Sequence, residues 1–131
     1  MRVVFDTNIF VSAIAIPGSQ AEKAMLRVIE GKDHLMISKD IIKELLTVLS
    51  GKFSRDQEEL AHVGVYLAEI GELAEPKQKV KVLEDEADNR ILECARAGHA
   101  DVIVTGDRAM LALGEYQGIK IVSLREYLTS P

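Results

Sequence analysis

Two short apolar stretches of the chain each lead to an aspartate. Val3-Val4-Phe5 is followed directly by Asp6, and Val102-Ile103-Val104 is followed by Thr105-Gly106 and then by Asp107. Continuous apolar runs of this length are typical of strands that are buried on both faces of a parallel sheet. Because the carboxyl ends of parallel strands meet at one edge of a sheet, we expect both carboxylates to lie at that edge.

Two further acids belong to predicted helices that begin at the same edge. Asp88 falls in the first turn of a helix predicted at 86–97, on the apolar stripe of that helix. Glu44 lies roughly 9 Å from the start of a helix predicted at 39–50, given a rise of ~1.5 Å per residue. Its Cα–Cβ bond tilts back toward the helix start. All four carboxylates are therefore expected to face one pocket.

Clustered carboxylates have a definite chemistry. They repel one another and raise one another's pKa unless a cation is present. Oxygen ligands alone suit Mg²⁺ or Mn²⁺ rather than zinc, and a carboxylate-held Mg²⁺ readily takes phosphate as a further ligand. With two such ions, one can activate water while the other stabilises the leaving oxygen of a phosphodiester. The pattern therefore predicts metal-dependent phosphodiester hydrolysis, and no glycine-rich phosphate loop is apparent in the sequence.

Each acid also has a simpler explanation when it is taken alone. Asp6 and Asp107 can be N-caps, because helices are predicted after both. Asp88 can belong to a capping box begun by Asp85, and Glu44 can be a surface residue of an amphipathic helix. Four independent caps and surface residues have no reason to converge on one edge of a sheet, so the combination favours a functional site.

The rest of the chain supplies alternating strands and helices. Alternation of this kind predicts a parallel sheet covered by helices on both faces, with right-handed crossovers and the ligand site beyond the carboxyl ends of the strands. Ser19, Ser38 and Ser54 are predicted caps. Residues 71–84 are ambiguous, and the alternation over 77–82 suggests a turn and a short strand with one exposed side. The predicted strands are 2–5, 35–37, 102–104 and 119–122, and the predicted helices run from Ile9 up to Pro17-Gly18 and over 20–30, 39–50, 55–70, 86–97, 107–113 and 124–129.

Length and composition limit the function classes. At 131 residues we expect one domain, 1–131, with its own core. The formal net charge of −5 argues against strong nonspecific nucleic-acid binding through global charge. Cys94 is the single cysteine, which excludes an internal disulfide and a cysteine metal cluster. We see no signal peptide and no transmembrane run, so a cytoplasmic protein without membrane contact is expected.

Four segments resemble the PIN-domain ribonucleases, of the kind found as VapC-like toxins in bacterial and archaeal toxin–antitoxin pairs. The similarity runs in order through nearly the whole chain and is weak only at 52–82. The matching segments are Val3–Ser12 with Asp6, Ile37–Leu49 with Glu44, Asp85–Ala95 with Asp88, and Ala100–Asp107 with Asp107.

The resemblance implies a compact α/β three-layer sandwich (α/β/α) with a mostly parallel sheet. It implies Mg²⁺ or Mn²⁺ bound by the four acids, which would be the catalytic residues, together with RNA cleavage, a homodimer and often a small antitoxin protein. Asn8, Ser38 and Thr105 fall where the family has polar residues that support the acids. The family often has another Asp where this chain has Ala109, which leaves open whether one or two metal ions bind.

An RNA path would need cations despite the negative net charge. Lys39, Lys43, Arg90 and Arg108 lie close in sequence to the four acids and are candidates for phosphate contacts, although a solvated surface charge is the simpler explanation for any one of them. The run Lys77–Lys81 is interpreted as an exposed strand face or edge protection rather than a binding patch.

Two alternatives remain beside a metal-dependent endoribonuclease. The first is a catalytically weak or inactive PIN-fold module that binds RNA or a protein partner. The second is a phospho-receiver module, which needs an acid pair after the first strand and a phosphoacceptor Asp at the end of a middle strand. Here only Asp6 follows the first strand, and the second strand ends in Ser38. The sequence leaves open the RNA target and the existence of an antitoxin.

Overall fold

The computed structural model describes residues 1–53 and 56–130. Its centre is a six-stranded sheet of order β3-β2-β1-β4-β6-β5, in which every neighbouring pair is parallel except β5 and β6. The strands are β1 (Arg2–Phe5), β2 (His34–Ile37), β3 (Glu72–Leu73), β4 (Val102–Val104), β5 (Glu115–Tyr116) and β6 (Ile119–Val122).

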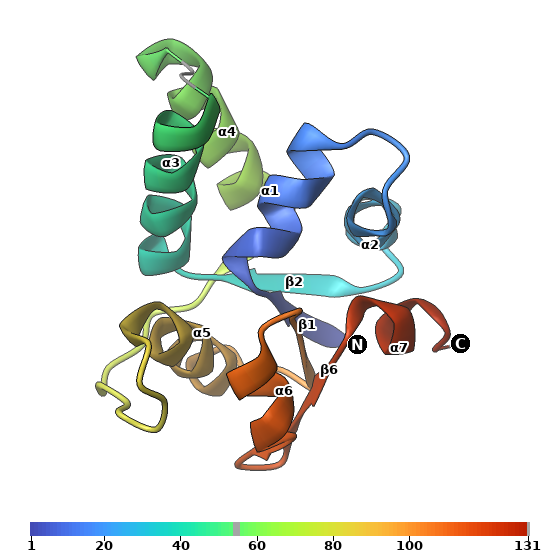
Figure 1. Cartoon of the computed structure of the whole chain (residues 1–131), viewed down its shortest axis with the longest axis vertical. Coiled ribbons are helices and arrows are strands. Elements are labelled where there is room, and N and C mark those ends of the chain that lie inside the picture. Colours follow the sequence, from blue (N-terminus) through green and yellow to red (C-terminus); the bar gives the residue numbers. More distant parts are fainter. Residues whose placement is uncertain (54–55, 131) are drawn as a thin grey trace.

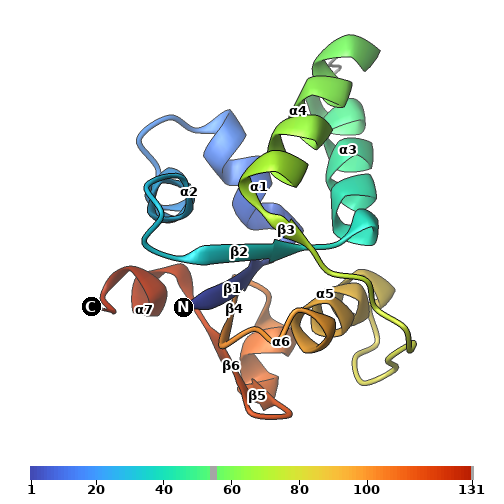
Figure 2. The same cartoon turned by 180° about the vertical axis from the view of Figure 1, so that it is seen from behind.

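Helices cover both faces of the sheet. Those described are α1 (Thr7–Ala15), α2 (Gln20–Ile29), α3 (Lys39–Phe53), α4 (Gln57–Ile70), α5 (Glu86–Ala97), α6 (Arg108–Leu113) and α7 (Leu124–Leu128). Figures 1 and 2 show α1 to α4 on one side of the sheet and α5 and α6 on the other, while α7 packs against α2. This is a three-layer α/β/α sandwich with a mostly parallel sheet, which confirms the predicted fold class.

The two central strands are as deeply buried as their sequences predict. Val3, Val4 and Phe5 of β1 have no exposed surface, and neither have Ile103 and Val104 of β4. Fully burying a side chain of this kind contributes about 1.5–3 kcal/mol. The strand ends that carry Asp6 and Asp107 are therefore held rigidly by the core.

Side-chain caps fix where several helices begin. Ser19 accepts a hydrogen bond from the amide of Glu22 at the start of α2, and Ser38 accepts one from the amide of Ile41 at the start of α3, so both predicted caps are confirmed. The predicted cap Ser54 lies outside the described residues. Asp56 caps α4.

The strand predicted within 77–82 is wrong. Strand β3 occupies only Glu72–Leu73, and an irregular segment follows as far as α5. The backbone amides of Val80, Val82 and Leu83 bond to side chains of α5. The Val80 amide donates to the Glu93 carboxylate at 2.8 Å, and the amides of Val82 and Leu83 donate to the Asn89 side-chain oxygen at 3.1 and 2.9 Å.

No helix in the described ranges is both long and apolar enough to cross a membrane.

We predict that Gly98→Ala destabilises the protein. Gly98 ends α5 against β2, and an added Cβ would lie 3.0 Å from the Cys94 carbonyl oxygen and 3.0 Å from the Met36 side chain. Overpacking of this kind costs about 1–3 kcal/mol of unfolding free energy, measured by urea denaturation. A Cβ added at Gly51 of α3 would have no atom of the described residues within 4 Å, so Gly51→Ala is the matched control and should stabilise by roughly 0.5–1 kcal/mol. Equal effects of the two substitutions would contradict the packing argument.

Candidate active site

Two aspartates meet where β1 and β4 end. The strands are direct neighbours, with Phe5 opposite Val104, and the Asp6 amide donates to the Val104 carbonyl at 3.0 Å. Asp6 is buried and caps α1, and Asp107 is half-buried and caps α6. The capping explanation is therefore correct for both residues, but it does not account for why the two carboxylates lie side by side.

Thr105 connects the two acids. Its hydroxyl donates to Asp6 Oδ2 at 2.6 Å and accepts a hydrogen bond from the Asp107 amide at 3.0 Å. Asp6 Oδ1 also faces the Asn8 amide at 3.4 Å, whereas the Asn8 side chain is exposed. The Thr105 hydroxyl and the Asn8 backbone amide thus each contact one oxygen of the Asp6 carboxylate, as groups that orient Asp6 would. Ser38 instead caps α3 at the end of β2.

Asp88, which lies in the first turn of α5, is the third acid of the cluster beside Asp6 and Asp107. Asp85 is the N-cap, as a capping box begun there requires, but its side chain accepts from the Ala87 amide and not from the Asp88 amide that a capping box uses. Asp88 is buried, and burial is the main cause that raises its pKa to about 7. The negative charges of Asp107, Asp85 and Asp6 raise the pKa further, as does a hydrogen bond with Asp107.

The pKa of Asp6 is raised for similar reasons. Burial raises its pKa above the ordinary value, the hydrogen bonds from Thr105 and Asn8 oppose that shift, and the charge of Asp107 adds to it. Asp6 and Asp88 thus both lie close enough to Asp107 for its negative charge to raise their pKa values.

Buried acids elsewhere in the molecule have cationic partners. Asp33 binds Arg27 at 2.9 Å and the Met1 amino group at 3.1 Å, and its pKa is lowered by hydrogen bonds from Tyr127 and Arg27 despite its burial. Glu93 binds Arg90 at 2.9 Å. Among the described residues, no cationic side chain forms an ion pair with the three clustered aspartates. A buried charge without compensation is costly, so this cluster suits an added cation.

Glu44 lies outside this cluster. It is exposed on α3 and lines a cleft of about 310 Å³ together with Thr7, Lys43 and Arg90. Thr7 directly follows Asp6, so the cleft adjoins the cluster. Thr7 was not singled out from the sequence, although its position beside Asp6 was a usable signal. Within residues 1–53 and 56–130, no three or more His, Cys, Asp or Glu side chains are already arranged to hold a metal ion.

The predicted cationic residues differ in their surroundings. Lys39, Lys43 and Arg108 are exposed. Arg90 is half-buried and pairs with Glu93, and its buried Nε atom has no hydrogen-bond partner among the described residues. Lys43 and Arg90 line the cleft together with three acids, Asp40, Glu44 and Glu86. In chemical terms, the donor set of buried carboxylate oxygens fits a hard divalent cation such as Mg²⁺ or Mn²⁺.

We predict that Asp88→Asn raises the melting temperature of the metal-free protein at about pH 8, and that the gain shrinks as the pH falls toward about 4. The pKa of Asp88 is about 7 in the folded protein, against about 3.9 for an unfolded Asp. The folded wild type therefore binds more protons than the unfolded chain, and its stability falls as the pH rises through this window. The asparagine variant lacks that loss.

Thermal denaturation in EDTA measures this effect. Glu115→Gln removes one exposed carboxylate outside the cluster and is the charge control. A gain for Asp88→Asn that is the same at both ends of the pH range would contradict the assignment.

Comparison with known proteins agrees with this architecture. A family model for the PIN domain matches residues 2–109. Uncharacterized protein MJ1680 of Methanocaldococcus jannaschii is 26% identical over 136 residues, which cover 100% of this chain and 87% of that protein.

Two solved structures share the fold. One is VapBC2 from Rickettsia felis bound to a DNA fragment from their promoter, with a TM-score of 0.65, 16% identity and coverage of 94% of this chain and 98% of that one. The other is VapBC-1 from nontypeable Haemophilus influenzae, with a TM-score of 0.65, 16% identity and coverage of 95% and 99%. Since the family model spans most of the chain, the chain belongs to the PIN-domain family.

Proposed function

We propose that this chain is a Mg²⁺- or Mn²⁺-dependent endoribonuclease that hydrolyses RNA phosphodiester bonds. The observation that carries the proposal is the cluster of Asp6, Asp88 and Asp107, which are held together without a cationic partner among the described residues while the buried acids Asp33 and Glu93 are paired. Membership of the PIN-domain family supports the same chemistry.

In this proposal the three aspartates hold the cation, and Glu44 contributes from the adjoining cleft. Thr105 orients Asp6 through its hydroxyl, and the Asn8 amide contacts the other oxygen of the same carboxylate. Ser38 supports the site by fixing the start of the helix that carries Glu44. A bound Mg²⁺ or Mn²⁺ supplies Lewis-acid activation of water and neutralises charge on the phosphate. Asp88 gives up its proton when it becomes a ligand.

The cations near the acids then contact the substrate. Lys39, Lys43 and Arg108 are exposed, so they are available to RNA phosphates, and Arg90 reaches the cleft from α5. The lysines and arginines offset the negative net charge of the chain only locally, so binding should depend strongly on salt.

We further propose that the protein is one PIN-like domain, 1–131, that acts in the cytoplasm as the toxin of a toxin–antitoxin pair. The shared fold with chains from two VapBC structures supports a small antitoxin as partner. A homodimer is part of the same proposal.

A second candidate is a PIN-fold module that binds RNA or a protein with weak or no cleavage. The observation that favours it is the absence, among the described residues, of three or more metal-binding side chains already arranged around one point. Calorimetric titration with Mn²⁺ separates the two candidates. Binding that is lost in Asp6→Asn supports the nuclease, and no carboxylate-dependent binding supports the module.

We predict that Asp6→Asn abolishes cleavage of a mixed RNA pool in Mn²⁺ and leaves the fold intact, because it removes charge and not volume. Asp101→Asn is the matched control. Asp101 immediately precedes β4, at the opposite end of that strand from Asp107, and accepts a bond from the Arg2 amide that an asparagine oxygen can also accept. EDTA should abolish cutting by the wild type. Full activity of Asp6→Asn would refute the site.

We predict that Thr105→Val lowers activity by roughly 10–100-fold without abolishing it, which is the usual effect of losing a group that orients a metal ligand. The substitution keeps the volume and removes the hydroxyl that donates to Asp6. Steady-state cleavage and Mn²⁺ affinity should fall together. Unchanged Mn²⁺ affinity in this variant would show that the hydroxyl does not orient a metal ligand.

A further inference from the structure

The segment between β3 and α5 is fastened along α5 by side chains of that helix. Glu93 accepts the Val80 amide, and Asn89 accepts the Val82 and Leu83 amides and donates to the Leu83 carbonyl at 2.7 Å. Both side chains are buried. Figure 2 shows the segment passing beside α5. It is therefore an ordered surface feature in spite of its irregular backbone.

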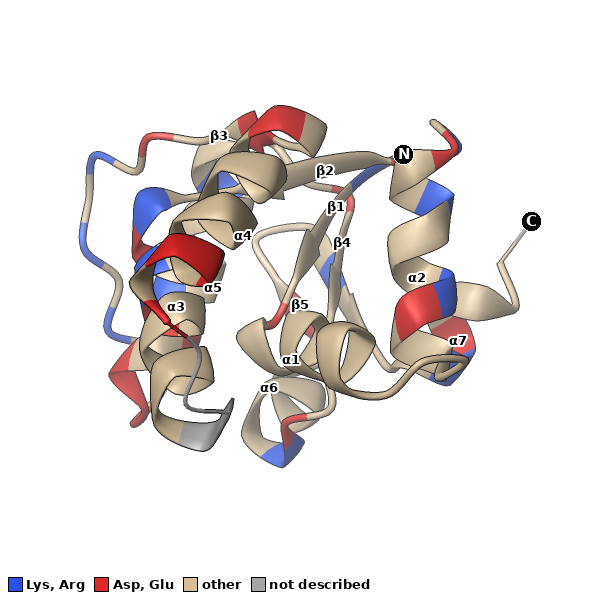
Figure 3. Cartoon of the chain, turned by 90° about the horizontal axis from the view of Figure 1, so that it is seen from above, with Lys and Arg blue, Asp and Glu red and all other residues tan. Residues whose placement is uncertain are grey.

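Three lysines project from this ordered segment. Lys77, Lys79 and Lys81, which we call the lysine ridge, are all exposed, whereas Val80 between them is buried. None of the three forms an ion pair with any described residue. Figure 3 shows blue positions along this loop, which the hydrogen bonds to Glu93 and Asn89 place beside α5. The ridge places three positive charges within five residues of a chain whose net charge is −5.

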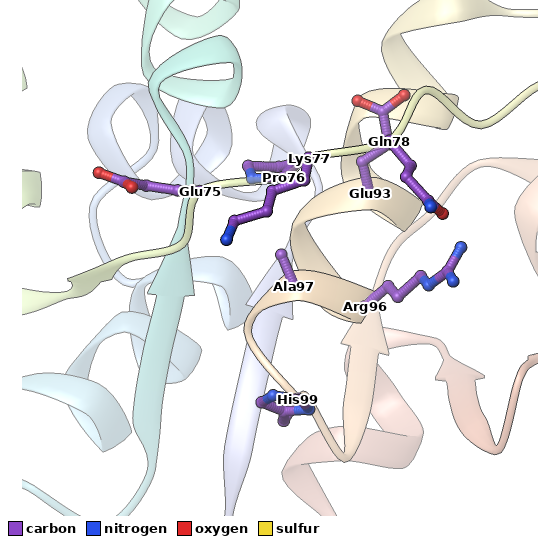
Figure 4. Close-up of a pocket in the computed structure, with 8 residues that line it drawn as sticks. All are labelled: Glu75, Pro76, Lys77, Gln78, Glu93, Arg96, Ala97 and His99. Atoms are coloured by element: carbon purple, nitrogen blue, oxygen red, sulfur yellow. The ribbon is translucent and has the colours of Figure 1, made fainter.

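A hollow of about 300 Å³ lies between residues 75–78, which include Lys77 of the ridge, and the C-terminal half of α5. Its lining combines apolar Pro76 and Ala97 with the cations Lys77 and Arg96, and Gln78 and His99 add polar groups. Figure 4 shows the Glu75 carboxylate pointing away from the other lining side chains. The Glu93 carboxylate is buried and neutralised by Arg90. Apolar surface from Pro76 and Ala97 next to the cations Lys77 and Arg96 suits a ribose with its flanking phosphates.

The ridge leads toward the candidate active site. From Arg96 back to Asp88, α5 covers about 12 Å at ~1.5 Å per residue. Arg90 lies between them, contacts the Val80 carbonyl at 3.5 Å, and lines the cleft that holds Lys43 and Glu44. Arg90 therefore contacts both the segment that carries the ridge and the cleft beside the acid cluster.

We propose that the lysine ridge and the hollow beside it bind the sugar–phosphate backbone of the RNA substrate, away from the bond that is cut. This rests on the proposed ribonuclease function. A line of cations that ends at a metal-binding acid cluster suits a phosphate chain, because a metal ion at the cluster accepts a phosphate while bare acids repel it. A peptide carboxylate can also bind such a metal ion, so polyglutamate is the competing ligand in the test.

The test measures RNA binding with the non-cleaving Asp6→Asn protein, so that binding is read independently of catalysis. Lys77, Lys79 and Lys81 are changed together to Gln in that background. Lys23, Lys32 and Lys120, which are exposed on α2, on the turn after it and on β6, are changed to Gln as a control with the same charge change. The probes are labelled single-stranded RNAs of about 4 and about 16 nucleotides, a range that matches the site sizes of single-strand binding proteins.

We predict that the ridge variant binds the longer RNA more weakly and that its salt slope falls by about 2, from roughly 0.7 per lost phosphate contact on a single strand. The control variant should keep the parental slope, and the shorter RNA should be affected less than the longer one. Arg96→Gln alone should weaken binding of the longer RNA in the same direction.

Equal losses in the ridge and control variants would overturn the proposal, because global charge would then be the cause. Unchanged RNA binding with lost binding of polyglutamate would overturn it in favour of an acidic protein partner. The two proposals fail separately. Wild-type protein that neither binds Mn²⁺ nor cuts RNA refutes the nuclease even if the ridge variant loses RNA binding, whereas active enzyme with an unaffected ridge variant refutes only the ridge.

Discussion

The mutual repulsion of three carboxylates at one edge of the sheet is the constraint on which the candidate site depends. Asp6, Asp88 and Asp107 are drawn together against their own electrostatics, and the pKa of Asp88 is raised to about 7 by its burial and by the neighbouring charges. A small domain has only about 5–15 kcal/mol of net stability, so such a cluster persists only where rigid elements impose it. Here β1 and β4 are fully buried neighbours, and Thr105 holds the side chains at their ends in register.

Much of the fold follows from local patterns in the sequence. The apolar runs at 3–5 and 102–104 lie in strands because a doubly buried position explains three consecutive apolar side chains, and α5 occupies 86–97 as its pattern predicts. The segment 77–82 was predicted wrongly because alternating lysine and valine imitates a half-exposed strand. Its hydrogen bonds go to Asn89 and Glu93, and such nonlocal partners leave no trace in a local periodicity.

The candidate site likewise has residues that local sequence patterns place and residues whose position depends on nonlocal contacts. Asp6 and Asp107 could be placed from the sequence because parallel strands share a carboxyl edge, and Asp88 because it lies in the first turn of a helix that begins there. Glu44 could not be placed as closely. Its distance along α3 was predictable, but its position at the border of the apolar stripe left its direction open, and the structure puts it in the adjoining cleft. Strand β5 was missed because it is two residues long and depends on the turn at Gln117-Gly118, where both φ angles are positive.

Helix α5 holds the lysine segment through backbone contacts, so substitutions in the segment can accumulate without loss of its structure. Asn89 and Glu93 bind backbone amides and a carbonyl, and those groups are the same whatever side chains the segment carries. Lys77, Lys79 and Lys81 can therefore be exchanged without loosening the segment, as long as Val80 stays apolar to fill its buried place. Side chains that contact the substrate could then change during evolution while the backbone of the segment keeps its place. Asp88 at the start of the same helix would be conserved for a separate reason, its part in the acid cluster.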